Sequence, residues 1–489
     1  MVDQFPIFLN LHWTYESESR KSRIQLWNKV DEQTLKKAAH DLKTKFLNSY
    51  SINDNVTEMW NFIKSEIKHI IESNIPTKLS SSRIHQPWIN TVTKRMIRKK
   101  NRWFQKAKSS RSSKVWEKYK KIKKCTQRTC RQTHDQWINN IFSDENCNSG
   151  LKKFWSYIKS LRHENIGIGD LKDKNNIPTS DPTRKANLIH EQFNSVFSDH
   201  IPTITPNFDP KERLPDIHNI KICKNGILKL LLNINPNKAN GPDEIPGRFL
   251  KTCAREIADI YQVLFQASLD QGIVPQDWKE ANVVPLFKKG DRSDPANYRP
   301  ISLTSLSCKL LEHVVQSNVM SHLDKYNVLD DAQHGFRKHR SCVSQLITTL
   351  DDFSNCLNKK EQTDAILLDF SKAFDKVDHE GLILKLEHFG IRNSLLNWIR
   401  SFLIDRKQRV LVDGMASTPT TVLSGVPQGT VLGPLFFLIY INDISKGLSQ
   451  GTKIRLFADD SLLYRTIKTP QDSATLQKDL DTLQIWESK

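Results

Sequence analysis

Two adjacent aspartates, Asp459 and Asp460, are the residues of this chain whose types and spacing most directly suggest chemistry. The apolar runs on either side, 454–457 and 461–464, predict two short strands joined by a turn at this pair. Adjacent carboxylates at a tight turn repel each other, so a fold tolerates them most easily when a divalent cation shares the site. The pair therefore predicts an anchor for metal ions in phosphoryl transfer, with ordinary turn chemistry as the alternative.

A third acid, Asp369, follows a continuous apolar run at 365–368 that is typical of a buried strand. An acid at the end of a central strand meets the Asp459–Asp460 turn if the two strands are neighbours. Three converging carboxylates can hold two Mg²⁺, with substrate phosphates and water completing the coordination. The spacing of the acids is therefore compatible with a two-metal site.

A loop rich in glycine and proline, residues 424–429, lies between the acids in sequence. Two glycines flank a proline there and let the backbone approach a ligand closely, while Gln428 offers both a donor and an acceptor. Pro434 suits the first turn of the helix predicted after the loop. We interpret two other acids upstream, Asp375 and Asp378, as caps of a helix that begins near residue 380.

The elements that position these residues belong to a long and strongly basic chain. Its 489 residues suffice for two to four domains, and the net charge of +19 with a pI near 9.4 favours a polyanionic partner, most simply nucleic acid. Eight cysteines without a regular framework fit a reducing intracellular compartment. The longest strongly apolar stretch, 434–441, is too short to cross a bilayer, so we expect no membrane partner.

Positive charge is concentrated in residues 94–131, the basic arm, where 17 Lys or Arg stand against the single acid Glu117. A helix this basic repels itself unless phosphates neutralise it, and the aromatic residues between the charges can stack on bases. The alternative is a solvated arm whose aromatics pack on a neighbour. The residues that we expect to contact nucleic acid here are Lys99, Lys100, Arg102 and Trp103.

Composition divides the chain into zones. Residues 13–197 have helical periodicity and include the basic arm, so they predict a helical, basic connector region. Four prolines mark 198–218 as a linker. Beyond it, 219–489 shows the mixed strand and helix patterning of a compact domain.

In their order along the chain, these motifs resemble those of the reverse transcriptases of non-LTR (LINE-type) retrotransposons, most closely the jockey-like branch. The resemblance runs from about Asn237 to the last residue. Besides the acids and the loop, it rests on the segments 238–243, 284–290, 297–303 and 333–337.

The resemblance implies an α+β fold with the fingers and palm of a right-hand polymerase. An antiparallel palm sheet with packed helices would occupy 219–489, after a mostly helical basic region. By the same resemblance, 1–12 looks like the last strand of the family's endonuclease, and the chain would stop before the thumb. Gln4 stands where the family's nuclease carries its catalytic His, so we expect no nuclease activity.

The implied activity is that of an RNA-directed DNA polymerase. Asp369, Asp459 and Asp460 would be its catalytic, metal-holding acids, with two Mg²⁺, or Mn²⁺ in their place, as cofactors. Its partners would be an RNA template, a DNA primer or target and dNTPs. Such a ribonucleoprotein is expected inside the cell, in the nucleus or the cytoplasm.

Further residues take roles from the same resemblance. Lys288 and Arg299 would clamp the incoming triphosphate, with Lys289 an alternative to Lys288, and Gln428 would lie against the nucleotide or template base. Phe374 falls at the sugar-gate position, where a bulky ring excludes a ribose 2′-hydroxyl, or else it packs in the core. Arg337 would touch the template or primer backbone, as would the neighbouring His334 unless its role is structural.

Two other functions remain open from the sequence. The first is a catalytically incompetent retrotransposon fragment that at most binds nucleic acid through the basic arm. The second is an RNA-templated RNA polymerase, which shares the palm acids but is disfavoured by Phe374 at the sugar gate.

Overall fold

The computed structural model describes residues 23–79, 88–110, 112–142, 155, 158, 167–197 and 213–487. The strand expected within 1–12 and most of the predicted linker, 198–212, lie outside these residues. By its internal contacts the chain falls into two compact units, Met1–Trp27 with Pro76–Ile166 and Asn28–Ile75 with Gly167–Lys489. This division differs from the sequence-based one, because parts of the expected connector region pack with the second unit.

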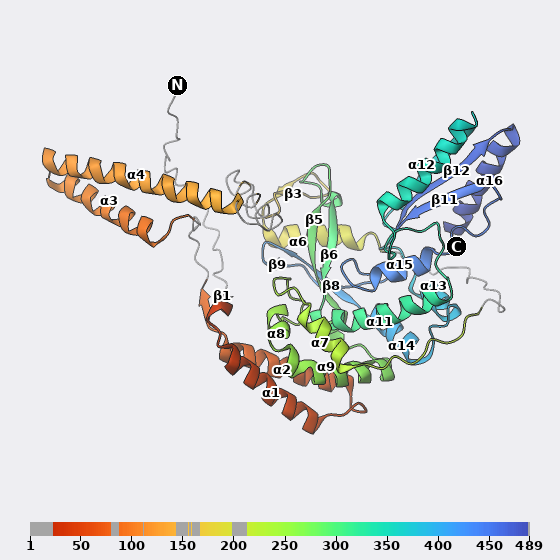
Figure 1. Ribbon diagram of the computed structural model, residues 1–489, viewed down its shortest axis with the longest axis horizontal. Helices are drawn as coiled ribbons and strands as arrows, with labels where there is room; N and C mark the ends of the chain where they lie inside the picture. Colours follow the sequence, from red (N-terminus) through yellow and green to blue (C-terminus); the bar gives the residue numbers. More distant parts are fainter. Residues whose placement is uncertain are drawn as a thin grey trace. The chain divides into compact units, whose positions relative to one another are not determined.

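The first unit contains a two-stranded sheet and a helical hairpin. Strand β1 (Arg23–Gln25) pairs antiparallel with β2 (Thr77–Leu79). Helices α3 (Thr91–Ser110) and α4 (Ser113–Phe142) run side by side and carry the basic arm (Figure 1). The prediction that this region is helical is confirmed.

Aromatic residues hold the two helices of the basic arm together. The rings of Phe104, Trp116 and Tyr119 lie with centroids 5.3–6.2 Å apart. The Lys118 ammonium lies 4.5 Å from the ring centroid of Trp103. These contacts match the alternative interpretation, in which the aromatics pack on a neighbouring element, although Phe104 remains exposed.

Helices form the base of the second unit (Figure 1). Asp31 and Asn55 cap the first two of them by accepting backbone N–H bonds, which explains where these helices begin. Trp60 packs edge-on against Trp278 at 5.1 Å and donates to Asp277. These helices are α1 (Glu32–Ser49), α2 (Val56–Asn74), α7 (Lys224–Leu232), α8 (Gly247–Thr252) and α9 (Ala254–Gln271), with the short α10 (Gln276–Lys279) after them.

The second unit also contains a five-stranded sheet. Its strand order is β10-β8-β5-β6, and β9 pairs with β8. β5 pairs antiparallel with β6 and parallel with β8. Helix α6 (Pro182–Asn194) packs on β8 and shares a buried core with it, including Phe193, Val283 and Val410. The strands are β5 (Glu280–Phe287), β6 (Tyr298–Leu303), β8 (Lys407–Val412), β9 (Met415–Ala416) and β10 (Thr420–Thr421), and β3 (Leu171–Lys172) and β4 (Pro178–Thr179) form a separate small pair.

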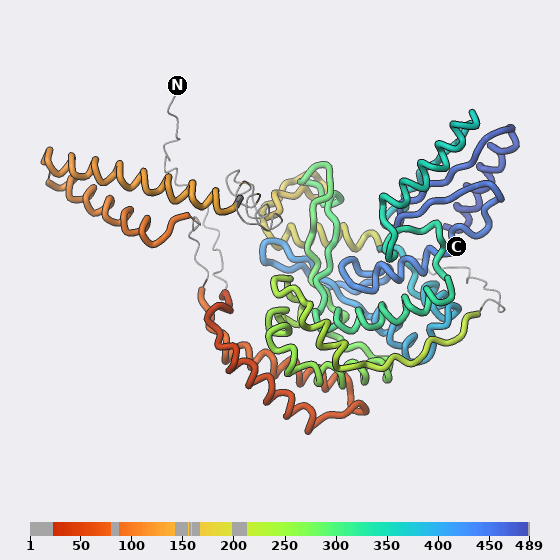
Figure 2. The backbone as a smooth tube through the Cα atoms, in the orientation of Figure 1, coloured from red at the N-terminus to blue at the C-terminus, as the bar shows by residue number. Residues whose placement is uncertain are grey.

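A three-stranded antiparallel sheet carries the acids. Its order is β11 (Thr452–Phe457), β12 (Asp460–Ile467) and β7 (Gln362–Leu368), so both strands flanking the Asp-Asp turn and the strand before Asp369 are confirmed. Helix α12 (Cys342–Asn358) lies along β11 and β7, and α16 (Pro470–Glu487) along β12 (Figure 2).

The expectation that 365–368 is a buried strand is wrong. Ala365 and Leu367 are exposed, Leu367 to 85%, and the residues of the other face, Ile366 and Leu368, are only half-buried. A continuous apolar run does not by itself distinguish a strand covered on both faces from one covered on one face.

The remaining helices connect the two sheets. The helix predicted after the loop is α15, with Pro434 in its first turn, and it is almost wholly buried. The bounds are α11 (Leu306–Lys325), α13 (His379–His388), α14 (Asn393–Leu403) and α15 (Gly433–Ile441), with 3₁₀ turns at Trp27–Lys29 and Pro295–Asn297. In the part of the chain described, no helix has both the length and the apolar character needed to cross a membrane.

Asp352 of α12 ties this helix to the sheet and supports a prediction about stability. It accepts from Lys453 and Arg455 of β11, the latter at 2.6 Å, and from the hydroxyl of Tyr464. Burial opposes ionisation, but the hydrogen bonds from Lys453, Tyr464 and Arg455 outweigh it and lower the pKa of Asp352 to about 2.

Asp352→Asn is expected to cost about 2 kcal/mol in the free energy of unfolding at pH 7, because a depressed pKa is a stability contribution of the ionised form. That contribution is present above the unfolded pKa and is lost as pH falls toward 2. In urea unfolding, the variant should therefore have a lower free energy of unfolding than the wild type at pH 7, and the difference should be smaller at pH 3. An equal deficit at both pH values would contradict this role.

Candidate active site

The three predicted acids lie at one end of the β11-β12-β7 sheet. Asp460 opens β12 and Asp369 directly follows β7, and the two strands pair so that Ser461 stands opposite Leu368. Asp460 precedes Ser461 and Asp369 follows Leu368, so the antiparallel pairing brings both acids to the same end of the sheet. Asp459 occupies the turn that joins β11 to β12.

The charges of Asp460, Asp369 and Arg299 act on the carboxyl of Asp459. Burial raises the pKa of its carboxyl, and the charges of Asp460 and Asp369 raise it further, while Arg299 opposes the shift. A carboxylate with a raised pKa beside two other acids is under-neutralised. A bound cation would relieve this repulsion.

The donor set fits a hard divalent cation. All three side chains supply carboxylate oxygens, which are the ligands that Mg²⁺ and Mn²⁺ prefer. Among the residues that the structure describes, no three His, Cys, Asp or Glu side chains already stand in a metal-binding arrangement. Mg²⁺ commonly binds to one or two carboxylates and completes its coordination with substrate phosphates and water, so it does not require three protein ligands.

The glycine-proline loop packs between β6 and the segment after β7. The N–H groups of Gly425 and Val426 donate to the carbonyl oxygens of Val377 and Phe374, both at 2.8 Å. Gly425 has φ +85°, and a Cβ there would lie 2.6 Å from the carbonyl oxygen of Asp375, so no other residue fits. The loop is thereby fixed against the chain that follows Asp369.

Asp375 has a different role from the one expected. Asp378 caps α13 by accepting from the N–H of Gly381, as predicted. The interpretation of Asp375 as a second cap is wrong: it accepts from the Gln428 side-chain amide at 3.2 Å. Burial raises the pKa of Asp375, and the charge of Lys372 and then this amide partly offset the effect. The segment after β7 therefore fixes the side chain of Gln428, a predicted nucleotide contact, through this hydrogen bond.

The predicted triphosphate-binding residues stand on and after the β5–β6 hairpin. Arg299 lies in β6 opposite Leu286, is exposed, and acts on Asp459 through space. Lys288 follows β5, and its backbone N–H donates to Asn297 at 2.9 Å. Lys288 and Lys289 are both exposed, so the choice between them stays open.

Phe374 is half-buried and has ring partners. It stacks on Phe437 of α15, with centroids 4.2 Å apart and planes inclined by 16°, and Phe336 meets it edge-on at 6.1 Å. The ring therefore contributes to packing, as the alternative interpretation holds. The same contacts would also fix its orientation for a gating role.

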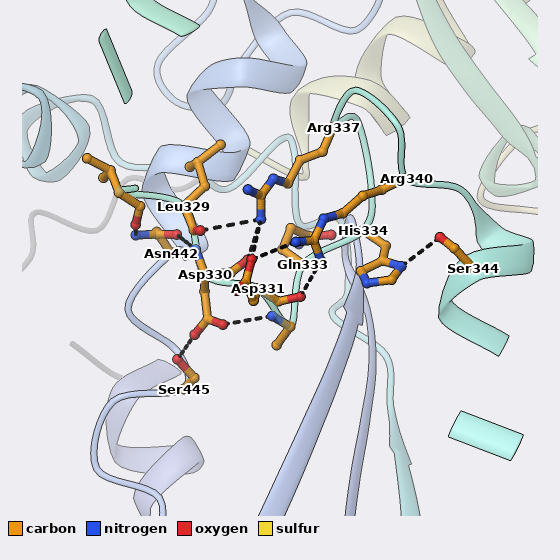
Figure 3. Close-up of polar contacts among 12 residues, drawn as sticks. Leu329, Asp330, Asp331, Gln333, His334, Arg337, Arg340, Ser344, Asn442 and Ser445 are labelled. Atoms are coloured by element: carbon orange, nitrogen blue, oxygen red, sulfur yellow. Dashed lines mark hydrogen bonds and ion pairs between the residues drawn. The ribbon is translucent and has the colours of Figure 1, made fainter. Parts of the chain in front are cut away.

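The segment that contains His334 and Arg337 is fastened by its own polar contacts (Figure 3). Arg337 donates to the carbonyl oxygens of Leu329 at 3.3 Å and Asp330 at 2.8 Å. The His334 Nδ1 lies 2.9 Å from the Ser344 hydroxyl. These contacts favour structural roles for both residues over contacts with nucleic acid.

Two residues that the sequence analysis missed support the site. Gln333 contacts the Asp-Asp turn through hydrogen bonds to the backbone of Ala458. Glu312 of α11 is fully buried and accepts from the N–H groups of Val431 at 2.6 Å and Leu432 at 3.2 Å, just before α15 begins. A lone acid inside the apolar stretch 310–315 was the available signal for Glu312.

The basic arm lies in the first unit, apart from these residues in the division of the chain. Lys99 and Arg102 are exposed there, while Lys100 and Trp103 are half-buried. The charge of the arm is therefore available to a polyanion, whereas Trp103 is partly covered by lysine side chains.

Comparison with known proteins finds a matching family model and several similar proteins. Residues 287–489 match the family model described as reverse transcriptase (RNA-dependent DNA polymerase). The probable RNA-directed DNA polymerase from transposon BS of Drosophila melanogaster is 30% identical over 274 residues, covering 53% of this chain and 30% of that protein. The RNA-directed DNA polymerase from mobile element jockey of the same organism is 29% identical over 271 residues, covering 54% of this chain and 29% of that protein.

The chain spans about 30% of the length of these relatives. Among solved structures, an apo telomerase of Candida tropicalis is similar over 49% of this chain and 60% of that chain, with 12% identity and a TM-score of 0.32, a likeness too slight to support an argument. Residues 287–489 thus resemble the reverse transcriptase family, and the chain is similar to the RNA-directed DNA polymerases of jockey-like non-LTR retrotransposons.

Proposed function

We propose that this chain is the RNA-directed DNA polymerase part of a non-LTR retrotransposon, which adds dNTPs to a primer 3′-hydroxyl on an RNA template. The observation that carries the proposal is the convergence of Asp369, Asp459 and Asp460 at one end of the β11-β12-β7 sheet, within electrostatic range of Arg299. That sheet would be the palm, and the β5–β6 hairpin part of the fingers. The working complex would be an intracellular ribonucleoprotein in the nucleus or cytoplasm.

The acids would hold two Mg²⁺, with Mn²⁺ as a substitute. Bound there, the ions would lower the pKa of the primer 3′-hydroxyl and offset charge on the triphosphate. The 3′-oxygen would attack the α-phosphorus in line, forming the new phosphodiester bond as the bond to pyrophosphate breaks. The raised pKa of Asp459 supports this role, because a cation relieves the repulsion that causes it.

The chain's other residues would bind and orient the nucleotide. The guanidinium of Arg299 can grip phosphate oxygens in a bidentate manner, with Lys288 or Lys289 adding a point charge. Gln428, held by Asp375, would face the nucleotide or template base. Phe374, supported by Phe437, would exclude a ribose 2′-hydroxyl.

A primer-extension assay tests the proposed function. The full chain is given a DNA primer annealed to RNA, Mg²⁺ and either dNTPs or rNTPs. We expect a DNA product whose length follows the template with dNTPs and little product with rNTPs. Efficient rNTP incorporation would favour an RNA polymerase instead, and no product with either substrate would favour the catalytically incompetent fragment.

The basic arm supports a second function, nucleic-acid binding that does not depend on catalysis. The arm contains 17 Lys or Arg residues and only one acid. This excess of positive charge would attract a polyanion, and counterions would be released when the polyanion binds. This binding would also supply the RNA template, primer or target DNA to the polymerase site.

Neutralising three charges of the arm should weaken binding and reduce its dependence on salt. In the triple variant Lys99→Gln, Lys100→Gln, Arg102→Gln, the plot of log binding constant against log salt concentration should become less steep by roughly 2, if each lost charge contacts one phosphate. The control Lys36→Gln, Lys37→Gln, Lys45→Gln removes the same charge from α1. Fluorescence anisotropy with single-stranded RNA between low and high salt measures both slopes. Equal slopes for the two variants would contradict a specific role of the arm.

A further inference from the structure

The turn that carries Asp459 is held in an unfavourable backbone conformation. Ala458, the residue before it, has φ +57° and is buried. A residue with a Cβ rarely adopts this left-handed region and stays there only when its surroundings enforce it. The direction of the Asp459 side chain therefore depends on whatever holds Ala458.

The side chain of Gln333 contacts both backbone polar groups of Ala458. Its Oε1 accepts from the Ala458 N–H at 2.9 Å, and its Nε2 donates to the Ala458 carbonyl oxygen at 3.2 Å. The same Oε1 accepts from the N–H of Gly335 at 2.8 Å. Gln333 is only 4% exposed, so water does not readily replace these bonds.

The backbone around Gln333 is fixed to the same strand. The N–H of Leu456 donates to Ala332 at 3.0 Å, and the N–H of His334 donates to Leu456 at 2.9 Å. A Cβ on Gly335 would lie 2.3 Å from the Ala458 nitrogen, so the two segments are in close contact. The residues 332–335 thus run along β11 on the side away from β12 and end against the turn.

We propose that Gln333 is a positioning residue for the metal site: it holds Ala458 in its left-handed conformation and so directs the Asp459 carboxylate toward Asp369 and Asp460. This inference rests on the proposed function, because it assigns Gln333 to the metal site described there. The role is separate from general packing, since both amide atoms of the side chain are used on the residue next to Asp459.

The test uses a matched pair of glutamines. Gln345 is similarly buried, and its amide donates to the carbonyl oxygens of Ala332 at 3.0 Å and Leu456 at 3.1 Å. It therefore fastens the same two segments without contacting the turn. Methionine is close to glutamine in length but lacks its amide, so Gln333→Met and Gln345→Met remove the hydrogen bonds with little change in volume.

Binding of Mn²⁺ to the full chain is measured by electron paramagnetic resonance, with the folded fraction checked by circular dichroism. Gln333→Met is expected to weaken Mn²⁺ binding roughly tenfold, because it leaves the buried backbone N–H and carbonyl groups of Ala458 without their partners. Gln345→Met is expected to bind Mn²⁺ like the wild type. Asp459→Asn defines the signal of the lost site. In primer extension, Gln333→Met should lower kcat roughly tenfold or more with little change in KM for dNTP.

Equal Mn²⁺ affinity in Gln333→Met and the wild type would overturn the inference, as would equal weakening in both methionine variants. Wild-type binding that Asp459→Asn leaves unchanged would also overturn it. If Gln333→Met alone weakens Mn²⁺ binding in a chain that extends no primer, the positioning role is supported and the proposed polymerase function fails.

Discussion

Asp459→Asn is expected to abolish primer extension while making the metal-free protein more stable. Asparagine keeps the shape of the side chain but removes the charge that a cation would bind. Loss of such a group from a catalytic set typically lowers the rate by roughly 10⁴-fold. Burial and the neighbouring Asp460 and Asp369 raise the pKa of Asp459, so its ionised form is unfavourable in the fold without a cation.

The stability gain of Asp459→Asn should depend on pH in a defined direction. A carboxyl whose folded pKa lies above its unfolded value destabilises the fold once pH rises through the folded pKa. The variant should therefore melt at a higher temperature than the wild type at pH 7, and the two should converge in acid below the unfolded pKa. Differential scanning calorimetry without metal measures both.

Magnesium should reverse this order at neutral pH. Added Mg²⁺ binds the folded wild type and raises its melting temperature by mass action, but it should leave Asp459→Asn nearly unchanged. Asp364→Asn, on the same sheet, is the control and should respond to Mg²⁺ like the wild type. A wild type whose melting temperature ignores Mg²⁺, or an Asp459→Asn chain less stable than the wild type at pH 7, would contradict the electrostatic description of the site.

Glu312→Leu is expected to destabilise the second unit by about 1–3 kcal/mol for each buried backbone N–H group that loses its acceptor. Glu312 acts through space on Arg406, which is buried at 2% exposure and donates to the Phe402 carbonyl oxygen at 2.8 Å. Burial lowers the pKa of Arg406, and the nearby Cys308 and Glu312 oppose that shift. The leucine variant also leaves the N–H groups of Val431 and Leu432 unpaired.

Glu312→Gln separates these two effects. The amide oxygen can still accept from the backbone before α15, whereas the negative charge that acts through space on Arg406 is lost. Urea unfolding should therefore place Glu312→Gln between the wild type and Glu312→Leu. A leucine variant as stable as the wild type would show that neither contact matters to the fold.

The acid-bearing elements could be predicted from the sequence because their signals are local. Two apolar runs around Asp459 and Asp460 predicted the hairpin, and Pro434 predicted the start of α15. The ordered motifs also predicted the family, which the match over 287–489 bears out.

The supporting contacts could not be predicted in this way, because they join residues far apart in the chain. Gln333 and Ala458 are separated by 125 residues, and Glu312 and Val431 by 119. Periodicity identifies strands and helices but not the partner of a single buried side chain. For the same reason Asp375 was interpreted as a local helix cap when its partner is Gln428, and the packing of α1 and α2 against α9 was not anticipated.

Magnesium-dependent extension of a DNA primer on RNA, compared between Asp369→Asn and Asp364→Asn, tests the central claim most directly. Asp364 lies within β7 and pairs across the sheet with Arg465, while Asp369 follows the strand's last residue at the end where Asp460 begins β12. If the three acids form the metal site of an RNA-directed DNA polymerase, the wild type and Asp364→Asn will extend the primer and Asp369→Asn will not. Extension by Asp369→Asn at the wild-type rate would contradict that claim.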